Sequence, residues 1–420
     1  MPQLLESMST IKFTEPSTLM SRRIYRRFPF NPLFRLSVAV ALTTLTIPCF
    51  GANPFITSIY TADPSAHVWA DGRLYVYPSR DMDPARGCDL MDHYHVFSTD
   101  DMVNWRDEGE ILNASQVAWG RPEGGFMWAP DCACKDGIYY FYFPHPSGTR
   151  WNDTWKIGVA TSTKPASDFK PGGYIEGLGG FGMIDPCVFI DTDGQAYIYV
   201  GGVGHCQVAK LKSNMIELDG KVQDMNGLVD FHEATWVFKR KDTYYLTYAD
   251  NNRDVNRLQY AISSSPLGPW TSKGVYLEPT GCDTSHGSVV EYKGQWYAFY
   301  HNKALSGQGN LRSICVDKMF FNDDGTIQTV IQTKAGVPAL HPAPAPNPDL
   351  KKYRAAIASS SDGATLAEEA AAIPPPDGWR LPVARRDVFR PTPAGRAARG
   401  GFADHGFYTS VRPRCRSGGQ

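Results

Sequence analysis

The sequence predicts an all-β protein: a five-bladed β-propeller followed by a disordered C-terminal tail. Two observations predict this fold. One strand–turn–strand pattern recurs five times, and helical periodicity is nearly absent between residues 53 and 340. Alternating apolar residues flank a short turn in each copy, which is the pattern of a β-hairpin. The five copies are HVWADGRLYVY (67–77), DCACKDGIYYFYF (131–143), CVFIDTDGQAYIYV (187–200), TWVFKRKDTYYLTY (235–248) and SVVEYKGQWYAFY (288–300).

A further strand-like segment follows each hairpin. These segments cover residues 94–99, 156–162, 206–212, 258–264 and 312–319. A hairpin with about two further strands makes a four-stranded unit, and units spaced by roughly 50 to 60 residues are typical of propeller blades. A long β-sandwich explains five copies less well, and the unequal spacing argues against a β-helix.

The first 52 residues are interpreted as a signal peptide region. Four arginines between residues 22 and 27 precede an apolar run from Leu36 to about Pro48, which is short for a membrane span. We place cleavage after Gly51 and the true start at Met8 or Met20, with an uncleaved membrane anchor as the alternative. The expected location is therefore periplasmic or extracellular, with no membrane attachment after the signal is removed.

The composition changes after the predicted propeller, which spans residues 53–340. Residues 341–350 form a Pro-rich linker, and residues 351–420 are rich in Ala, Arg, Pro, Gly and Ser with few aromatic side chains. Such a segment buries too little apolar surface to form a core, so residues 341–420 are predicted to be a disordered tail.

The overall charge and the cysteines limit the function classes. The formal net charge of -1 does not favour nucleic acid or an anionic membrane as partner. Nine cysteines are present, and none is spaced as in a paired zinc-binding motif. Although an exported protein can form disulfides, we interpret the cysteines as buried free thiols. The oligomeric state is left open.

Three acidic residues precede repeat strands by a similar distance. They are Asp63 in TADPSAHVW, Asp185 in MIDPCVFID and Glu233 in FHEATWVFK. Inner strands of different blades converge at one end of a propeller axis, so these carboxylates are expected to meet there. A proline follows both aspartates and would fix the local backbone. Taken singly, an Asp-Pro pair is a common turn former, but the repeated register favours a functional site.

Paired carboxylates are the groups that glycoside hydrolysis requires. One carboxylic acid protonates the leaving oxygen, and in inverting enzymes a second carboxylate activates a water from the opposite side. A third carboxylate nearby raises the pKa of the acid by like-charge repulsion and so keeps it protonated.

These motifs resemble glycoside hydrolase family 43, whose members are inverting enzymes on a five-bladed propeller. The resemblance covers about residues 53–335 and rests on the early DP element, IDPCVFIDTDGQAY, and EATWVFK followed by YYLTY. It implies that Asp63 is the general base, Asp185 the pKa modulator and Glu233 the general acid. The run ATW after the acid resembles members that act on arabinoxylan.

The resemblance also implies supporting residues. Arg312 matches an arginine that hydrogen-bonds the sugar, and His286 matches a histidine on the propeller axis that supports a bound calcium. Calcium prefers oxygen ligands, so His286 alone is weak evidence for a metal. No cofactor is required for the reaction, and a structural calcium is the one metal considered.

Aromatic residues near the second repeat are candidates for sugar stacking. Trp128 in GGFMWAPD matches a segment lining the family's pocket, and an indole face stacks on the apolar face of a sugar ring. Phe126 and Trp69 are weaker candidates of the same kind. Asp131 is expected to bind sugar hydroxyls or to cap the turn.

The function predicted from these features is release of arabinofuranose or xylose from plant hemicellulose such as arabinoxylan. Alternatives are a hydrolase of arabinan, galactan or fructan, and a carbohydrate-binding propeller without catalysis. The chain lacks the RDP motif of retaining fructan hydrolases, and its first motif reads ADPSAH. Because all three acids are present, an enzyme is favoured over a binding module.

Overall fold

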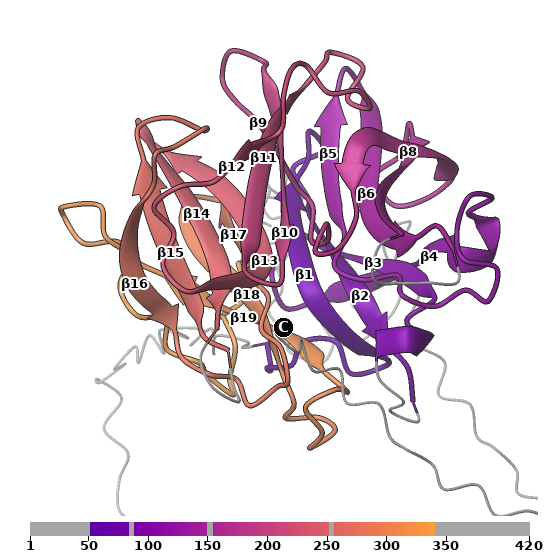
Figure 1. Cartoon of the computed structure of the whole chain (residues 1–420). Helices are drawn as coiled ribbons and strands as arrows, with labels where there is room; N and C mark the ends of the chain where they lie inside the picture. Colours follow the sequence, from indigo (N-terminus) through magenta and orange to yellow (C-terminus); the bar gives the residue numbers. More distant parts are fainter. Residues whose placement is uncertain (1–50, 84–87, 149–153, 252–255, 341–420) are drawn as a thin grey trace, which may run out of the picture. The chain divides into compact units, whose positions relative to one another are not determined.

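A computed structural model describes residues 51–83, 88–148, 154–251 and 256–340 of the chain. These residues form five antiparallel sheets arranged as the blades of a propeller (Figure 1), which confirms the predicted fold. They contain no α-helix, only two short 3-10 helices, η1 (Cys88–Leu90) and η2 (Ala114–Gln116). No described helix is therefore long and apolar enough to cross a bilayer. The predicted signal region, except Gly51 and Ala52, and the predicted tail lie outside the described residues.

The first two blades contain four strands each. Blade one consists of β1 (Tyr60–Val68), β2 (Leu74–Asp81), β3 (His93–Thr99) and β4 (Trp105–Asn113). Blade two consists of β5 (Asp131–Lys135), β6 (Ile138–Pro146), β7 (Trp155–Ser162) and β8 (Lys170–Gly179). In each blade the strands are hydrogen-bonded in chain order.

The remaining blades continue the same order. Blade three consists of β9 (Cys187–Ile190), β10 (Ala196–Gly202), β11 (His205–Leu211) and β12 (Gln223–Asp224). Blade four consists of β13 (Phe231–Arg240), β14 (Thr243–Asp250), β15 (Leu258–Ser263) and β16 (Thr271–Leu277). Blade five consists of β17 (Ser288–Tyr292), β18 (Gln295–Asn302) and β19 (Ser313–Met319). All five predicted hairpins and all five third strands are confirmed, but blade five has three strands in the described part where four were expected.

The first strand of every blade lies next to the axis. Contacts run from β1 to β5, from β5 to β9, from β9 to β13, from β13 to β17 and from β17 back to β1. Polar side chains join these inner strands: Trp236 Nε1 donates to the carbonyl of Val289 at 3.0 Å, and Ser288 Oγ accepts from the backbone N of Ala66 at 3.2 Å. Residues at the beginnings of the inner strands are thereby held around one axis.

The N-terminal segment closes the ring of blades. Figure 1 shows β1 beside the last strands of the described chain, and β1 contacts β17, β18 and β19. Before β1, the side chain of Asn53 donates to the carbonyl of Val316 at 3.0 Å and accepts from its N–H at 3.0 Å. The N–H of Phe55 donates to the carbonyl of Ile314 at 3.1 Å. Residues 53–55 therefore cover the edge of β19 that a fourth strand would occupy.

The core lies between neighbouring blades and is rich in tyrosine. Buried aromatic and aliphatic side chains of blades three, four and five form the largest cluster, and blades one and two share another. Six cysteines of the described part of the chain are free thiols: Cys132, Cys187, Cys206, Cys282 and Cys315 are buried, and Cys134 is half-buried. The preference for free thiols over disulfides is therefore confirmed for these six residues.

Candidate active site

The three predicted catalytic acids come together at one end of the inner strands. Asp63 lies in β1 and Glu233 in β13, while Asp185 lies two residues before the start of β9. The Nδ1 atom of His286 lies 4.0 Å from Oδ1 of Asp63 and 3.8 Å from Oδ2 of Asp185. The charges of Glu233 and Asp63 both act on Asp185. Carboxylates from blades one, three and four therefore face a single site.

The backbone is irregular wherever an acid is presented. Asp63 and Asp185 adopt positive φ angles of 50° and 52°, and Ala234, which follows Glu233, has a φ of 70°. The pairing of β1 with β2 shifts register after Ala62, and that of β13 with β14 shifts around Glu233. A bulge turns a side chain out of the regular alternation of a strand, and aspartate tolerates left-handed backbone better than most residues. These local distortions aim the carboxylates at the axis.

Asp63 is held by contacts on both carboxylate oxygens. Ser79 Oγ donates to Oδ2 at 2.7 Å, and Arg312 donates to Oδ1 at 2.9 Å. The backbone N–H of Asp63 donates to Nδ1 of His301 at 3.1 Å, and Nε2 of His301 lies 2.8 Å from the carbonyl of Thr284. This pattern requires the tautomer of His301 with its proton on Nε2. The carboxylate is therefore fixed in one orientation.

The surroundings of Asp63 favour its ionised form. Burial raises the pKa of its carboxyl, but the positive charge of Arg312, the interactions with His301 and His286 and the hydrogen bond from Ser79 outweigh burial, so the pKa lies below its usual value. An ionised carboxylate is the form that accepts a proton from water. The electrostatics of Asp63 thus suit a general base.

Arg312 is buried behind Asp63. Its Nε and one terminal nitrogen hold Asp81 at 2.9 and 2.8 Å, and the other terminal nitrogen contacts Asp63 at 2.9 Å and Thr284 at 3.0 Å. The terminal nitrogen that holds Asp81 also lies 3.9 Å from the sulfur of Met91. In this structure protein atoms thus occupy the guanidinium donors that were expected to bind sugar. Arg312 orients Asp63, and a direct contact with sugar remains a prediction.

Glu233 and Asp185 favour their protonated forms. Burial raises the pKa of Glu233, an effect that His232, 3.6 Å away, partly opposes and that the charge of Asp63 reinforces. Burial raises the pKa of Asp185 further above its usual value, reinforced by the charges of Glu233 and Asp63. The side chain of Glu233 is 17% exposed and that of Asp185 is 6% exposed, so Glu233 is the more accessible of the two acids.

Asp185 is tied to the strand that carries Glu233. Its Oδ2 accepts the backbone N–H of Ala234 at 2.8 Å, and its carbonyl accepts from Thr235 Oγ1 at 2.6 Å. These bonds connect the loop before β9 to the bulge in β13. Asp185 therefore fixes the position of Glu233 and interacts with its charge, as a pKa modulator and orienting residue would.

The predicted stacking residues form an aromatic cluster. Trp128 is half-buried and lies 4.4 Å, between ring centroids, from the fully buried Trp155. Phe126 is 7% exposed, and the guanidinium of Arg121 lies 4.9 Å from its ring centroid. The hydroxyl of Tyr94 donates to the carbonyl of Trp128 at 2.5 Å, and the charges of Asp63 and Asp185 act on it. Trp128 is therefore linked to the acids through Tyr94 and is half-buried, whereas Phe126 is buried and packs beside it, with 5.8 Å between the ring centroids.

Asp131 occupies a different position from the one expected. Its side chain is 1% exposed and accepts from Ser65 Oγ at 2.7 Å, from His67 Nε2 at 2.7 Å and from the backbone N–H of Val188 at 2.5 Å. These partners belong to blades one and three. The prediction that Asp131 binds sugar hydroxyls or caps a turn is therefore wrong. Asp131 is too deeply buried to reach a ligand, and its hydrogen bonds join three inner strands.

Trp69 is also displaced from the predicted role. It follows the end of β1 opposite to Asp63, stacks on the ring of His67 at 4.8 Å between centroids, and donates from Nε1 to the hydroxyl of Tyr77 at 2.9 Å. These contacts place Trp69 in the packing between blades one and two. The prediction that Trp69 stacks on sugar is therefore wrong, and its side chain instead packs between the two blades.

The amino-acid sequence of the propeller matches a known protein family. The model of the glycosyl hydrolases of family 43 matches residues 52–327. The chain belongs to this family. It is therefore a glycosidase, and the earlier resemblance is confirmed.

Characterised relatives of this family 43 glycosidase cover most of its propeller. A xylosidase/arabinosidase 43A from Humicola insolens is 36% identical over 333 residues, which are 66% of this chain and 98% of the relative. A xylosidase/arabinosidase from Bacteroides ovatus is 36% identical over 319 residues, which are 64% of this chain and 95% of the relative. A solved β-xylosidase/α-arabinofuranosidase from a compost metagenome, in complex with xylotriose and free of calcium, is 34% identical, with a TM-score of 0.61 and coverage of 67% and 98%.

The donors around His286 do not by themselves form a calcium cage. Calcium takes six to eight oxygen ligands at about 2.3 to 2.6 Å. Burial lowers the pKa of His286 to about 4, so its imidazole is neutral at neutral pH. It offers one nitrogen, and both nearby carboxylates, Asp63 and Asp185, lie 3.8 Å or more from that nitrogen. A calcium ion here would need water for most of its ligands.

Several residues of this glycosidase site were not singled out from the sequence. Ser79 and Asp81 lie in the second strand of blade one, His301 in the second strand of blade five, and Thr284 in the loop before β17. The only signal was a polar residue at the end of an otherwise apolar run, as in YVYPSRD and YAFYHN. Polar groups within buried strands need partners, but the sequence does not identify those partners.

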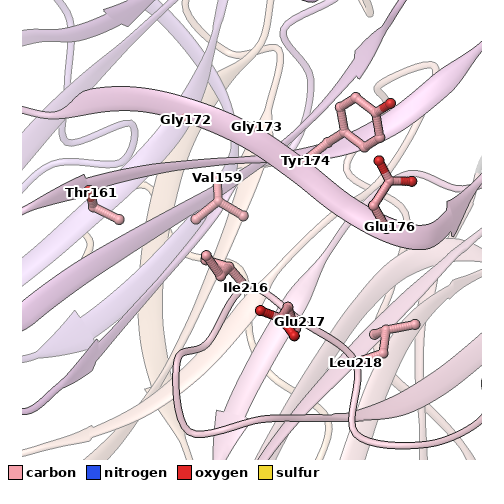
Figure 2. A pocket seen from close by; sticks show the side chains of 9 residues that line it. All are labelled: Val159, Thr161, Gly172, Gly173, Tyr174, Glu176, Ile216, Glu217 and Leu218. Atoms are coloured by element: carbon pink, nitrogen blue, oxygen red, sulfur yellow. The ribbon is translucent and has the colours of Figure 1, made fainter.

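A separate groove of about 520 Å³ lies on the outer strands of blade two. Figure 2 shows that it is bounded by Val159 of β7, Tyr174 and Glu176 of β8 and the turn at Ile216 and Glu217. None of the predicted site residues lines it. The acids at the axis, and not this groove, carry the chemistry expected of the family.

Proposed function

We propose that this family 43 enzyme hydrolyses β-xylosidic and α-L-arabinofuranosidic bonds in plant hemicellulose such as arabinoxylan, with inversion of configuration. The observation that carries the proposal is the opposite direction of the two pKa shifts: that of Asp63 is lowered and that of Glu233 is raised. One carboxylate is thus ionised while the other retains its proton over the same pH range. This is the division of roles that inverting hydrolysis requires.

The proposed reaction follows from these protonation states. Asp63 accepts a proton from a water molecule that attacks the anomeric carbon, and Glu233 donates its proton to the departing glycosidic oxygen. Asp185 holds the bulge that presents Glu233, and Arg312 holds Asp63. Trp128 offers a ring face on which the sugar stacks. The enzyme needs no cofactor for these steps.

The two pentoses are proposed together because relatives carry both activities in their names. The relatives from Humicola insolens and Bacteroides ovatus are each named xylosidase/arabinosidase, and the compost enzyme was solved with xylotriose. Arabinofuranose and xylopyranose present similar hydroxyls to one pocket. The substrate partner is therefore a plant polysaccharide or oligosaccharide.

The decisive experiment compares the parent enzyme with Glu233→Ala on arabinoxylan and on xylotriose, with chromatography of the released sugars. Arabinose and xylose from the parent alone would support both activities. Release by the variant at the parental rate would remove Glu233 from the role of acid. Saturable binding of xylotriose without any product would instead favour a non-catalytic carbohydrate-binding propeller.

We also propose that the enzyme is exported. The arginines at 22–27 and the apolar run after them support this proposal, since together they have the order of a signal peptide. Expression of the full chain, followed by N-terminal sequencing of the protein recovered outside the cytoplasm, tests it. A new N-terminus near Ala52 is expected, and full-length protein retained in the cytoplasm would contradict it.

A further inference from the structure

A second cluster of ligating side chains lies on blade one, separate from the catalytic acids. His93 and His95 are two residues apart on β3, so their side chains share one face of the strand. Glu110 of β4 pairs directly with His95 in the sheet. One ligating atom from each of these three residues lies within 4.8 Å of the others, and no other such cluster of three His, Cys, Asp or Glu residues occurs in the described residues.

His93 provides an independent sign that this cluster has a ligand. Its side chain is 8% exposed, and its Nε2 atom has no hydrogen-bond partner among the described residues. Oε2 of Glu110 lies 4.0 Å from this atom, which is too far for a hydrogen bond. A buried ring nitrogen without a partner is costly, and a metal ion between His93 and Glu110 would satisfy it.

In both histidines a carboxylate contacts Nδ1, the ring nitrogen on the other side from Nε2. Asp92 contacts Nδ1 of His93, and Oδ1 of Asp107 lies 3.1 Å from Nδ1 of His95. A carboxylate on one ring nitrogen fixes the tautomer and the orientation of a metal-binding histidine, and it strengthens the other nitrogen as a ligand. Both histidines therefore have the second partner that metal-bound histidines usually have.

The charges around His93 also suit a cation. The groups that face His93 are Asp92, Glu110 and Arg80, of which two are acidic. The Glu110 side chain is 46% exposed and is free to turn toward the rings.

We propose that His93, His95 and Glu110 bind a first-row transition-metal dication of the Zn²⁺ type. Two imidazoles and one carboxylate are ligands that zinc accepts at about 2.0 to 2.2 Å, with water in the fourth position. Calcium and magnesium prefer oxygen ligands. The bound ion would join β3 to β4 next to Tyr94, whose hydroxyl holds the Trp128 carbonyl, and would thereby stabilise the wall of the active site.

The test is calorimetric titration of chelator-treated full-length enzyme with Zn²⁺. Because other groups in the chain also bind zinc, the comparison with variants decides the result. The double variant His95→Gln/Glu110→Gln is expected to lose one equivalent of bound zinc, or to bind it at least tenfold more weakly. The variant His205→Gln removes an exposed histidine of β11 and should leave the isotherm unchanged.

Two further readouts make the assignment specific. Cu²⁺ bound to the parent should show nitrogen hyperfine structure from two imidazoles in its electron paramagnetic resonance spectrum, and His95→Gln should reduce this to one. Asp107→Asn should weaken zinc binding by about 10- to 100-fold, because it removes the group that orients His95. Both residues are at least partly exposed, so the variants should fold, which a thermal melt verifies.

Three results would overturn the proposal. An unchanged zinc isotherm in the double variant would place the zinc elsewhere. No uptake of zinc by the parent would exclude the site. Displacement of the zinc by equimolar Ca²⁺ would contradict the assignment to transition metals. Since arabinoxylan hydrolysis is measured separately, failure of this site leaves the proposed activity untouched.

Discussion

The guanidinium of Arg312 lies 2.9 Å from Oδ1 of Asp63 while two of its nitrogens hold Asp81. The arginine precedes β19 of the last blade, and the aspartate lies in β1 of the first blade. The closure of the ring of blades thus brings together a base and the cation that keeps it ionised.

Arg312→Lys should move the low-pH limb of activity to higher pH. The charge of Arg312 lowers the pKa of Asp63, and lysine lacks the planar fork that holds Asp81 and Asp63 together. With a raised pKa, the base is protonated, and activity lost, at a higher pH than in the parent. We also expect kcat to fall by about 100-fold from misplacement of the base. A pH profile of kcat/KM measures both effects, and an unshifted limb would contradict the role assigned to Arg312.

Glu233→Gln and Asp63→Asn should differ in their dependence on the leaving group. Loss of either group should slow xylotriose hydrolysis by about 100- to 10,000-fold. A nitrophenyl glycoside needs little protonation of its leaving oxygen, so Glu233→Gln should retain much more activity on it than on xylotriose. Asp63→Asn should be impaired on both substrates. Equal losses on both substrates for the two variants would refute the separate roles.

His232→Gln should move the high-pH limb of activity upward. His232 Nε2 lies 3.6 Å from Glu233, and its charge lowers the pKa of that carboxyl. Without this charge, Glu233 holds its proton to higher pH and continues to act as an acid there. The pH dependence of kcat/KM tests this, with Lys241→Gln as a control that removes an exposed cation just beyond the other end of β13. A downward shift would mean that His232 supports protonated Glu233.

Asp131→Ala should destabilise the propeller more than it affects the chemistry. It leaves the buried N–H of Val188 and the hydroxyl of Ser65 without their acceptor, and we expect a loss of roughly 3 kcal/mol in the free energy of unfolding. Chemical denaturation measures the loss. Asp242→Ala, at an exposed turn position, should have little effect. A fully stable Asp131→Ala variant that fails only in substrate binding would restore the sugar-binding role.

Local patterns in the sequence predicted the strands and the three acids. The hairpin at residues 187–200 became β9 and β10 because alternating apolar side chains and the DTDG turn act within a few residues of one another. The repeated offset of Asp63, Asp185 and Glu233 from their strands was also visible without any tertiary contact. Blade five was predicted less well, because residues 53–55, distant in sequence, cover its edge.

Local sequence patterns were thus sufficient to predict the fold class, the repeat and the types of the three acids. Only the tertiary structure decided which acid is ionised, since the pKa of Asp63 depends on Arg312, 249 residues away along the chain. It likewise decided that Asp131 joins three blades and that His93, His95 and Glu110 form a cluster. The physical reason is that propensity and periodicity act between near neighbours in the chain, whereas burial, charge pairing and ligand clusters depend on residues that only the closed ring of blades brings together.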